Sequence, residues 1–223
     1  MGRFVNPNNS AFQVALNSQI YVDKTGLIAY TNNVLATMQG YICNSRPRRF
    51  GKSMAADMLS AYYSCGEDSS TLFEGLAISH APSYREHLNQ YNVVKVNMQD
   101  FLSMTHSVEE MLAMLQKYIA FDLLEAFEQV RFRDENNLIQ VMKDIYAKTG
   151  SSFVILIDEW DCLFREYQQD SAAQKQYLDF LRSWLKDKDY VALAYMTGIL
   201  PIKKYGSHSA LNMFFEYSMT DPG

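Results

Sequence analysis

Short stretches rich in apolar and β-branched residues alternate along the chain with stretches in which apolar residues recur every three or four positions. The first kind predicts strands over 41–45, 92–98, 153–157, 190–196 and 213–218. The second kind predicts helices over 25–38, 52–63 and 134–148, and from 107 and 171 onward. Strands that alternate with helices predict an α/β fold, a mostly parallel sheet of about five strands covered on both faces.

Polar residues mark where two of these helices begin. Ser107 with Glu110, and Ser171 with Gln174, have the spacing of capping boxes. The opening dozen residues are polar, and we expect them to be loosely ordered.

A Gly-Lys-Ser sequence joins the first predicted strand to the helix over 52–63. It completes the phosphate-binding pattern G-x-x-x-x-G-K-[ST], except that Arg46 replaces the first glycine. N–H groups and the dipole at a helix N-terminus favour bound phosphate. We therefore expect the nucleotide-binding residues to be Arg46, Pro47, Arg48, Arg49, Phe50, Gly51, Lys52, Ser53 and Met54.

Individual roles in this loop follow from the chemistry of the side chains. Lys52 is expected to bridge the outer phosphates, and Ser53 to offer its hydroxyl to Mg²⁺. Arg48 and Arg49 add charge that a glycine-rich loop lacks, so they either clamp the γ-phosphate from within the chain or contact an acidic partner. A solvated basic turn would explain the loop alone equally well, but an acidic strand downstream favours the nucleotide.

That acidic strand runs through five apolar residues into Asp158 and Glu159. Asp158 is expected to hold the Mg²⁺ shell, and Glu159 to orient or deprotonate the attacking water. Asp161 is a third carboxylate, for which a helix cap or a surface charge is as good an explanation as a metal role.

The fourth predicted strand ends at Thr197. With these markers, five strands match the additional-strand branch of P-loop NTPases, a three-layer sandwich with the order 5-1-4-3-2, where this strand lies between the two motifs. The hydroxyl of Thr197 is then a candidate contact of the γ-phosphate or the water, and a polar strand end is the plain alternative.

No arginine follows Arg182, and the stretch before the last strand holds only Lys203 and Lys204 as cations. An arginine from a neighbouring subunit typically raises phosphoryl transfer by about a thousandfold or more. The alternatives are an arginine of the 46–49 loop acting in cis, a group outside the chain, or slow turnover.

Composition narrows the class of protein. The chain has 223 residues, 48% of them hydrophobic, which suits one domain with a substantial core. A net charge of -5 argues against a general affinity for nucleic acid. Three cysteines without a spacing pattern indicate neither a disulfide framework nor a zinc site, and no stretch has the length of a membrane span, so we expect a reducing cytoplasm.

Four segments resemble the predicted AAA-ATPase-like family found in many gut and other anaerobic bacteria. They are Tyr-Val-Asp-Lys-Thr-Gly-Leu-Ile (21–28), Ser-Arg-Pro-Arg-Arg-Phe-Gly-Lys-Ser-Met (45–54), Leu-Ile-Asp-Glu-Trp-Asp (156–161) and Thr-Gly-Ile-Leu-Pro-Ile-Lys (197–203). The resemblance extends over nearly the whole chain and makes the missing glycine a family trait.

This resemblance implies a single P-loop NTPase domain over 1–223, with residues 1–40 as an extension and helix before the core. It implies ATP and Mg²⁺ as ligands, and a position near the base for Tyr21, Asp23 and Lys24. Members usually continue into a lid and a domain like the PD-(D/E)XK nucleases, and we expect both to be absent from this chain. A homo-oligomer or a nuclease-like partner is implied in their place.

Three functions are compatible with these features. The first is Mg²⁺-dependent ATP hydrolysis that drives a conformational switch in an attached or partner domain. The second is a module that binds nucleotide without hydrolysing it. The third is a small-molecule kinase, which the Asp158-Glu159 pair disfavours because a water-activating glutamate is typical of NTPases. A role with nucleic acid rests only on the basic loop and the family's usual partner domain.

Overall fold

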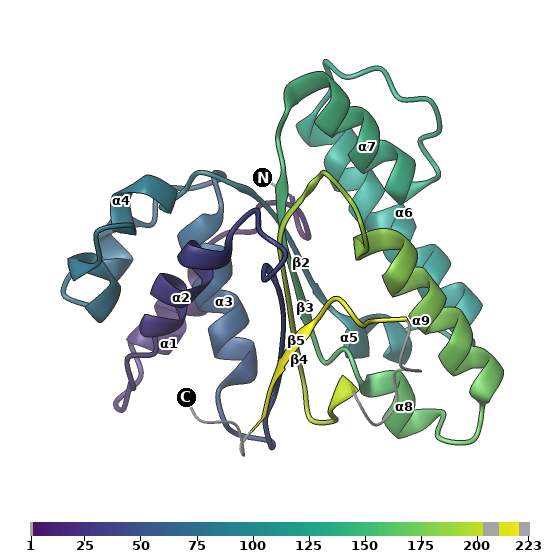
Figure 1. The fold of residues 1–223 in the computed structure, drawn as a ribbon, viewed down its shortest axis with the longest axis horizontal. Helices are drawn as coiled ribbons and strands as arrows, with labels where there is room; N and C mark the ends of the chain where they lie inside the picture. Colours follow the sequence, from purple (N-terminus) through teal and green to yellow (C-terminus); the bar gives the residue numbers. More distant parts are fainter. Residues whose placement is uncertain (1, 203–209, 219–223) are drawn as a thin grey trace.

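Five parallel strands form one sheet in the computed structural model, which describes residues 2–202 and 210–218 (Figure 1). The strands are β1 Tyr41–Ser45, β2 Asn92–Asn97, β3 Phe153–Asp158, β4 Val191–Gly198 and β5 Phe215–Tyr217. Their order, β2-β3-β4-β1-β5, is the predicted one, and β4 lies between the loop strand and the acidic strand. The predicted α/β class is likewise confirmed.

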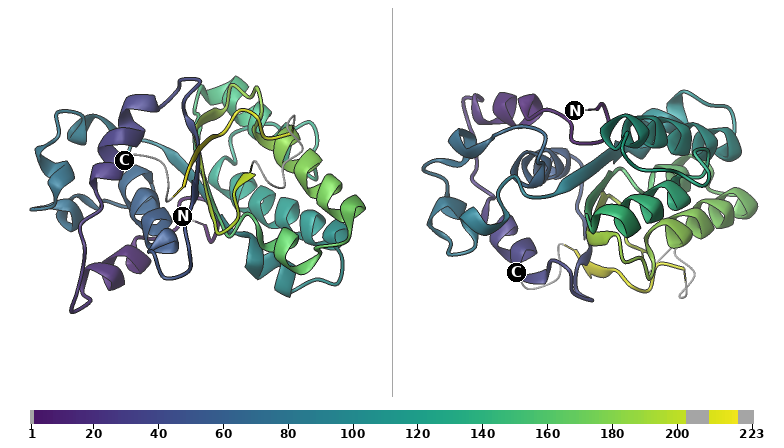
Figure 2. Two further views of the ribbon diagram at one scale, coloured as in Figure 1. Left: turned by 60° about the horizontal axis from the view of Figure 1, so that its bottom comes forward. Right: turned by 90° about the horizontal axis from the view of Figure 1, so that it is seen from above.

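Helices cover both faces of this sheet (Figures 1 and 2). One face carries α1 Ser10–Leu16, α2 Gly26–Val34, α3 Lys52–Tyr63 and α4 Tyr84–His87, with two short 3₁₀ helices at Ser70–Phe73 and Ala77–His80. The other face carries α5 Met98–Ser103, α6 Val108–Ala126, α7 Leu138–Thr149, α8 Cys162–Glu166 and α9 Ser171–Leu185. None of the helices in the described ranges is both long and apolar enough to cross a membrane.

The central strand β3 shows why polar chemistry gathers at one edge of the sheet. All of its residues are buried, and alternate side chains belong to the two cores on opposite faces. Val154 and Leu156 pack with α3, whereas Ile155 and Ile157 pack with α6 and α9. A strand covered in this way tolerates charge only at its end. Asp158 is therefore the first place on β3 where a carboxylate is accommodated.

The beginning of α9 differs from the prediction. Asp170 is its cap, because the carboxylate accepts the N–H of Ala173 at 2.9 Å. Ser171 is already helical, and the amide of Gln174 donates to the carbonyl of Tyr167 at 2.8 Å instead of closing a capping box. The capping box over 171–174 was wrong, since aspartate one residue earlier is an equally good cap and provides it here.

Helix and strand lengths also differ at several ends. The helix expected over 25–38 ends at Val34, and the one expected over 134–148 runs from Leu138 to Thr149. The last strand is shorter than 213–218. Element ends depend on local caps and neighbours, which periodicity does not contain.

The opening segment is docked on the sheet, so the expectation of loose order was wrong. Val5 is 1% exposed and pairs antiparallel with Val94 of the edge strand β2. Asp122 of α6 accepts the backbone N–H groups of Phe4 at 2.6 Å and Val5 at 3.1 Å. These contacts are with residues about ninety to a hundred and twenty positions later, so no local pattern could indicate them.

The end of β4 packs directly on the turn that follows β3. A Cβ atom at Gly198 would lie 2.6 Å from the indole ring of Trp160 and 2.8 Å from a carboxylate oxygen of Asp161. Trp160 is fully buried, and its backbone N–H donates to the carbonyl of Thr197 at 3.0 Å. Only glycine leaves room for this contact, which fixes the two strand ends relative to each other.

We therefore expect Gly198→Ala to lower the free energy of unfolding by about 1–3 kcal/mol through overpacking against a rigid ring. Calorimetry should show a fall in Tm of about 2–4 °C for each kcal/mol. Gly26→Ala is the matched control, because a Cβ there meets nothing within 4 Å. Equal Tm changes in the two variants would contradict the steric argument.

Candidate functional site

A pocket of about 470 Å³ opens at the carboxyl edge of the sheet, between the loop after β1 and the turn after β3. It is lined by Arg48, Arg49, Gly51, Lys52, Ser53, Met54, Gln99, Glu159 and Arg165. Four of these side chains are cationic and one is a carboxylate. The excess of positive charge suits a polyanion such as a triphosphate.

The loop after β1 contains two residues with left-handed backbone just before α3. Gly51 is the N-terminal cap of α3 and has a left-handed φ of 73°. Glycine adopts this conformation without the penalty that a side chain would bring. Arg49 is also left-handed, with a φ of 68°. The loop thus turns sharply just before Lys52, the first residue of the helix.

The structure explains why arginine is accepted where the phosphate-loop pattern has its first glycine. The N–H of Arg46 donates to the carbonyl of Gly198 at 3.0 Å, which continues the ladder between β1 and β4. Arg46 is not among the residues with positive φ. At this position the chain is still extending the strand, so glycine's conformational freedom is not required.

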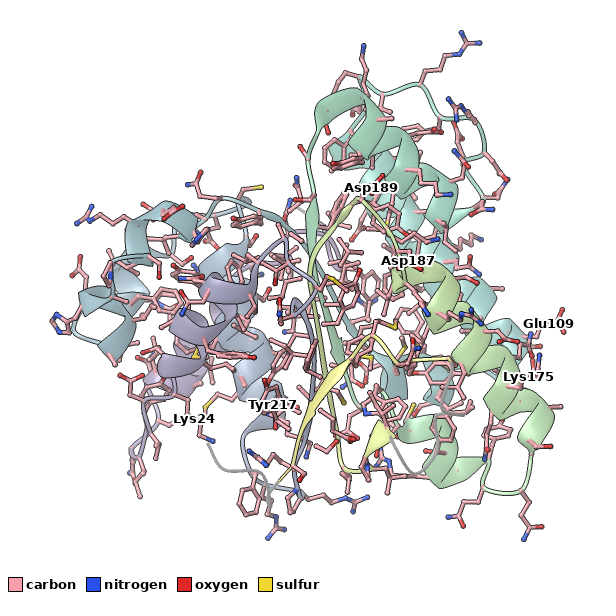
Figure 3. All side chains as sticks on the ribbon, viewed as in Figure 1. Lys24, Glu109, Lys175, Asp187, Asp189 and Tyr217 are labelled. Carbon is pink, nitrogen blue, oxygen red and sulfur yellow. The ribbon has the colours of Figure 1, made fainter. Side chains whose placement is uncertain are left out.

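Two lysines hold the loop through its carbonyl groups. The ammonium group of Lys52 is buried and donates to the carbonyl of Pro47 at 3.0 Å, so the loop curls around it. Lys24, in the segment before α2 (Figure 3), donates to the carbonyl of Phe50 at 2.9 Å. Arg46, Pro47 and Phe50 therefore contribute backbone contacts, whereas the remaining predicted loop residues line the pocket itself.

Two carboxylates, Asp158 and Glu159, stand at the carboxyl end of the acidic strand β3. Asp158 is 4% exposed, and its Oδ1 accepts the hydroxyl of Thr197 and the N–H of Glu159, the latter at 3.0 Å. Thr197 is fully buried, so its hydroxyl orients the Asp158 carboxylate. Glu159 has a left-handed φ of 53° and lines the pocket with Lys52.

Ser53 and Asp158 line a second, adjoining pocket of about 300 Å³. Oδ1 of Asp158 already accepts two hydrogen bonds, whereas its Oδ2 accepts none from the described residues. A hydroxyl and a carboxylate oxygen are ligands that Mg²⁺ prefers, and this ion usually takes only one or two protein carboxylates. The donors present therefore fit Mg²⁺. A cluster of three or more ligating side chains does not occur in the part of the chain that the structure covers.

Sequence reasoning missed two residues of the pocket, Gln99 and Arg165. Gln99 lies in the first turn of α5, which follows β2. Asn97 caps this helix by accepting the N–H of Gln99 at 2.9 Å. Arg165 lies on α8 and makes an ion pair with Glu159. Its Nη2 also lies 3.5 Å from Oε1 of Gln99. No local pattern indicates this pair, because Glu159 precedes α8 and lies six residues before Arg165. The arginines considered from the sequence were those of the 46–49 loop and the stretch after β4, where none occurs.

Asp161 is neither a surface charge nor a side-chain cap of α8. It is fully buried and lies 3.5 Å from Nε of Arg165. Its Oδ2 accepts the N–H groups of Ile199 at 3.1 Å and Leu200 at 2.9 Å. This carboxylate therefore joins the turn after β3 to the turn after β4.

The segment before α2 is fixed by a second carboxylate. Asp23 accepts the N–H of Thr25 at 2.8 Å and the N–H of Ala77 at 2.7 Å. Burial opposes ionisation of this group, but the hydrogen bonds from Thr25 and Ala77 hold the pKa of Asp23 below its ordinary value. The segment that carries Lys24 is thereby positioned beside the loop. Lys203 and Lys204, the cations after β4, lie outside the described residues.

The cysteine near the acidic strand is not a reactive thiol. Burial raises the pKa of Cys162 to about 12, so it is protonated at neutral pH. Burial also raises the pKa of Cys43 in β1. Both side chains act as small apolar residues of the core.

Similarity to known proteins identifies the family of the chain. An "Uncharacterized protein in vnfD 5'region" of Azotobacter chroococcum mcd 1 is 24% identical over 208 residues, which cover 89% of the chain but 37% of that protein. The chain thus spans little more than a third of this relative's length. Residues 10–207 match the family described as Predicted AAA-ATPase. Both sequence motifs lie within this range, and the chain belongs to that predicted AAA-ATPase family.

Proposed function

We propose that this chain binds Mg²⁺-ATP at the carboxyl edge of its sheet and hydrolyses it. The observation that carries the proposal is the convergence of Lys52, Ser53 and Glu159 on one pocket, from segments about a hundred residues apart. Ser53 and Asp158 both line the adjoining pocket, which supports their assignment to one ion. Cations, a hydroxyl and two carboxylates in this arrangement suit phosphoryl transfer, which depends on positioning and charge neutralisation.

In the proposed pose, the phosphates lie against the N-terminus of α3. The loop N–H groups and the ammonium of Lys52 bind the β- and γ-phosphate oxygens. To reach them, Lys52 exchanges its hydrogen bond with the carbonyl of Pro47 for bonds to phosphate. Arg48 and Arg49, which are exposed at the pocket mouth, contact the γ-phosphate from the solvent side.

Hydrolysis transfers the γ-phosphoryl group to water. The water oxygen bonds to the γ-phosphorus as the bond to the bridging β–γ oxygen breaks, and ADP and inorganic phosphate leave. Glu159 orients the water and takes its proton. Thr197 acts indirectly, because its hydroxyl fixes the carboxylate of Asp158.

Ser53 and Asp158 are the residues that would hold Mg²⁺, directly or through its water ligands. When bound, the ion neutralises charge that develops on the phosphate oxygens. The two protein ligands come from α3, which follows β1, and from the end of β3. Since β4 lies between β1 and β3 in the sheet, the spacing of the ligands depends on an intact sheet.

Turnover would drive a conformational switch in an attached or partner domain. The relative from Azotobacter chroococcum is longer and has residues outside the matched region that such a domain could occupy.

A module that binds nucleotide without hydrolysing it is the alternative. The ion pair of Glu159 with Arg165 favours this module, because the arginine engages the proposed base. A small-molecule kinase would instead place labelled phosphate on an acceptor.

Lys52→Ala should weaken ATP binding by about 10- to 100-fold, because charge-assisted hydrogen bonds of roughly 1.5–3 kcal/mol are lost. Calorimetric titration with Mg²⁺-ATP measures this change. Lys175→Ala is the matched control, since Figure 3 shows Lys175 on the outer surface of α9 and its ion pair with Asp179 is exposed. Undiminished binding by Lys52→Ala would refute the proposed nucleotide site.

Glu159→Gln should retain ATP binding but slow single-turnover phosphate release by about 10²- to 10⁴-fold, the usual contribution of a general base. Release of ³²P-phosphate from γ-labelled ATP is the measurement. Glu109→Gln, a change on the outer helix α6 (Figure 3), should leave release unchanged. If the wild-type chain binds ATP and releases no phosphate, the non-hydrolysing module is correct instead.

A further inference from the structure

Arg165 lies where a nucleotide's terminal phosphate would meet the proposed catalytic base. It belongs to α8, the short helix that begins four residues after Asp158. Its side chain is 21% exposed and lines the same pocket as Lys52. Lys52 comes from the β1 side of the pocket and Arg165 from the β3 side, with β4 between these strands. The pocket therefore brings together side chains of the phosphate loop and of the helix after β3.

The contacts of Arg165 fix the guanidinium on one side only. Behind it, Nε lies 3.5 Å from Oδ2 of Asp161, although the geometry is not that of a hydrogen bond. In front, Nη2 donates to Oε2 of Glu159, and at 3.5 Å to Oε1 of Gln99. Asp161 is itself immobilised by two backbone N–H groups. On one side the guanidinium thus lies against the immobilised carboxylate of Asp161, and on the other it binds Glu159, a contact that a ligand in the pocket could replace.

The exchangeable partner is Glu159, the residue proposed to activate water. Its side chain is 23% exposed, and an oxygen of its carboxylate is engaged by the arginine. A γ-phosphate in this pocket carries more negative charge than a carboxylate and offers oxygen acceptors that match the arginine fork. It would therefore compete with Glu159 for the same guanidinium.

We propose that Arg165 is a positioning residue that senses the γ-phosphate and controls Glu159. Without nucleotide, Arg165 holds the Glu159 carboxylate. When the γ-phosphate enters, the guanidinium turns about its anchor at Asp161 to bind it, and Glu159 is released to orient the water. This inference rests on the proposed function. In it, Arg165 is an arginine from the same chain that contacts the γ-phosphate, whereas the sequence after β4 contains none. ADP has no γ-phosphate and leaves the ion pair in place.

A binding cycle tests this exchange. Affinities for a non-hydrolysable ATP analogue and for ADP, both with Mg²⁺, are measured for the wild type, Arg165→Gln, Glu159→Gln and the double variant. Arg165→Gln should weaken analogue binding by about tenfold and change ADP binding by less than about twofold, because only the analogue gains the charge-assisted bonds. Glu159→Gln should strengthen analogue binding severalfold, since the competing carboxylate is removed.

The double variant separates the proposal from a merely structural ion pair. If the pair only stabilises the fold, the effects of the two changes on the analogue-to-ADP affinity ratio are absent. If the exchange occurs, the gain produced by Glu159→Gln disappears once Arg165 is also replaced. Single-turnover phosphate release should also fall by about a hundredfold or more in Arg165→Gln, as expected for the loss of a donor that acts in the transition state.

Three outcomes decide the matter. An unchanged affinity ratio in Arg165→Gln, with binding still dependent on Lys52, overturns this inference and leaves the proposed function standing. Absence of nucleotide binding by the wild type overturns both. If Arg165→Gln unfolds, Glu159→Gln alone still tests the exchange, because it keeps the arginine, and Arg165→Lys should give an intermediate ratio. No gain in analogue affinity in Glu159→Gln then counts against the proposal.

Discussion

The buried carboxylate of Asp161 is the interaction on which the geometry of this edge of the sheet depends. A charge without solvent must be compensated, and here two backbone N–H groups after β4 and the nearby guanidinium of Arg165 do so. The same contacts tie the turn after β3 to the turn after β4. Asp158 and Glu159 precede Asp161 by three and two residues, so they belong to the segment that these contacts hold.

Steric constraint reinforces this electrostatic one. Gly198 lies against the indole of Trp160, and Thr197 donates its hydroxyl to Asp158. The backbone of β4 at Gly198 and the side chain of Thr197 are thus both in contact with the residues that end and follow β3. Because β4 also pairs with β1, the strand before the phosphate loop shares this frame. Strand pairing therefore fixes the strand ends from which the lining segments of the pocket continue.

The parts of this arrangement that sequence could predict are those written in local patterns. Apolar strands and the period of the helices predicted the α/β class, and the match of the two motifs to the additional-strand branch of P-loop NTPases predicted the sheet order. Because parallel strands bring their carboxyl ends to one edge, the Gly51-Lys52-Ser53 turn and the acidic strand end were expected at the same edge. Gln99 and Arg165 were missed, since glutamine and arginine on short helices carry no periodic signal. The docking of Val5 and the contact of Lys24 with Phe50 connect distant segments, and only the folded chain reveals them.

The opening segment has a consequence for the behaviour of the protein in solution. β2 is an edge strand of the sheet. An uncovered edge strand has unpaired N–H and C=O groups with which strands of other molecules can pair. Here the N–H of Asn6 bonds the carbonyl of Val93, and the carbonyl of Phe4 accepts the N–H of Lys95, so part of that row is already satisfied. The residues before the first helix thereby cover part of the edge of β2 and disfavour its pairing with the sheet of another molecule.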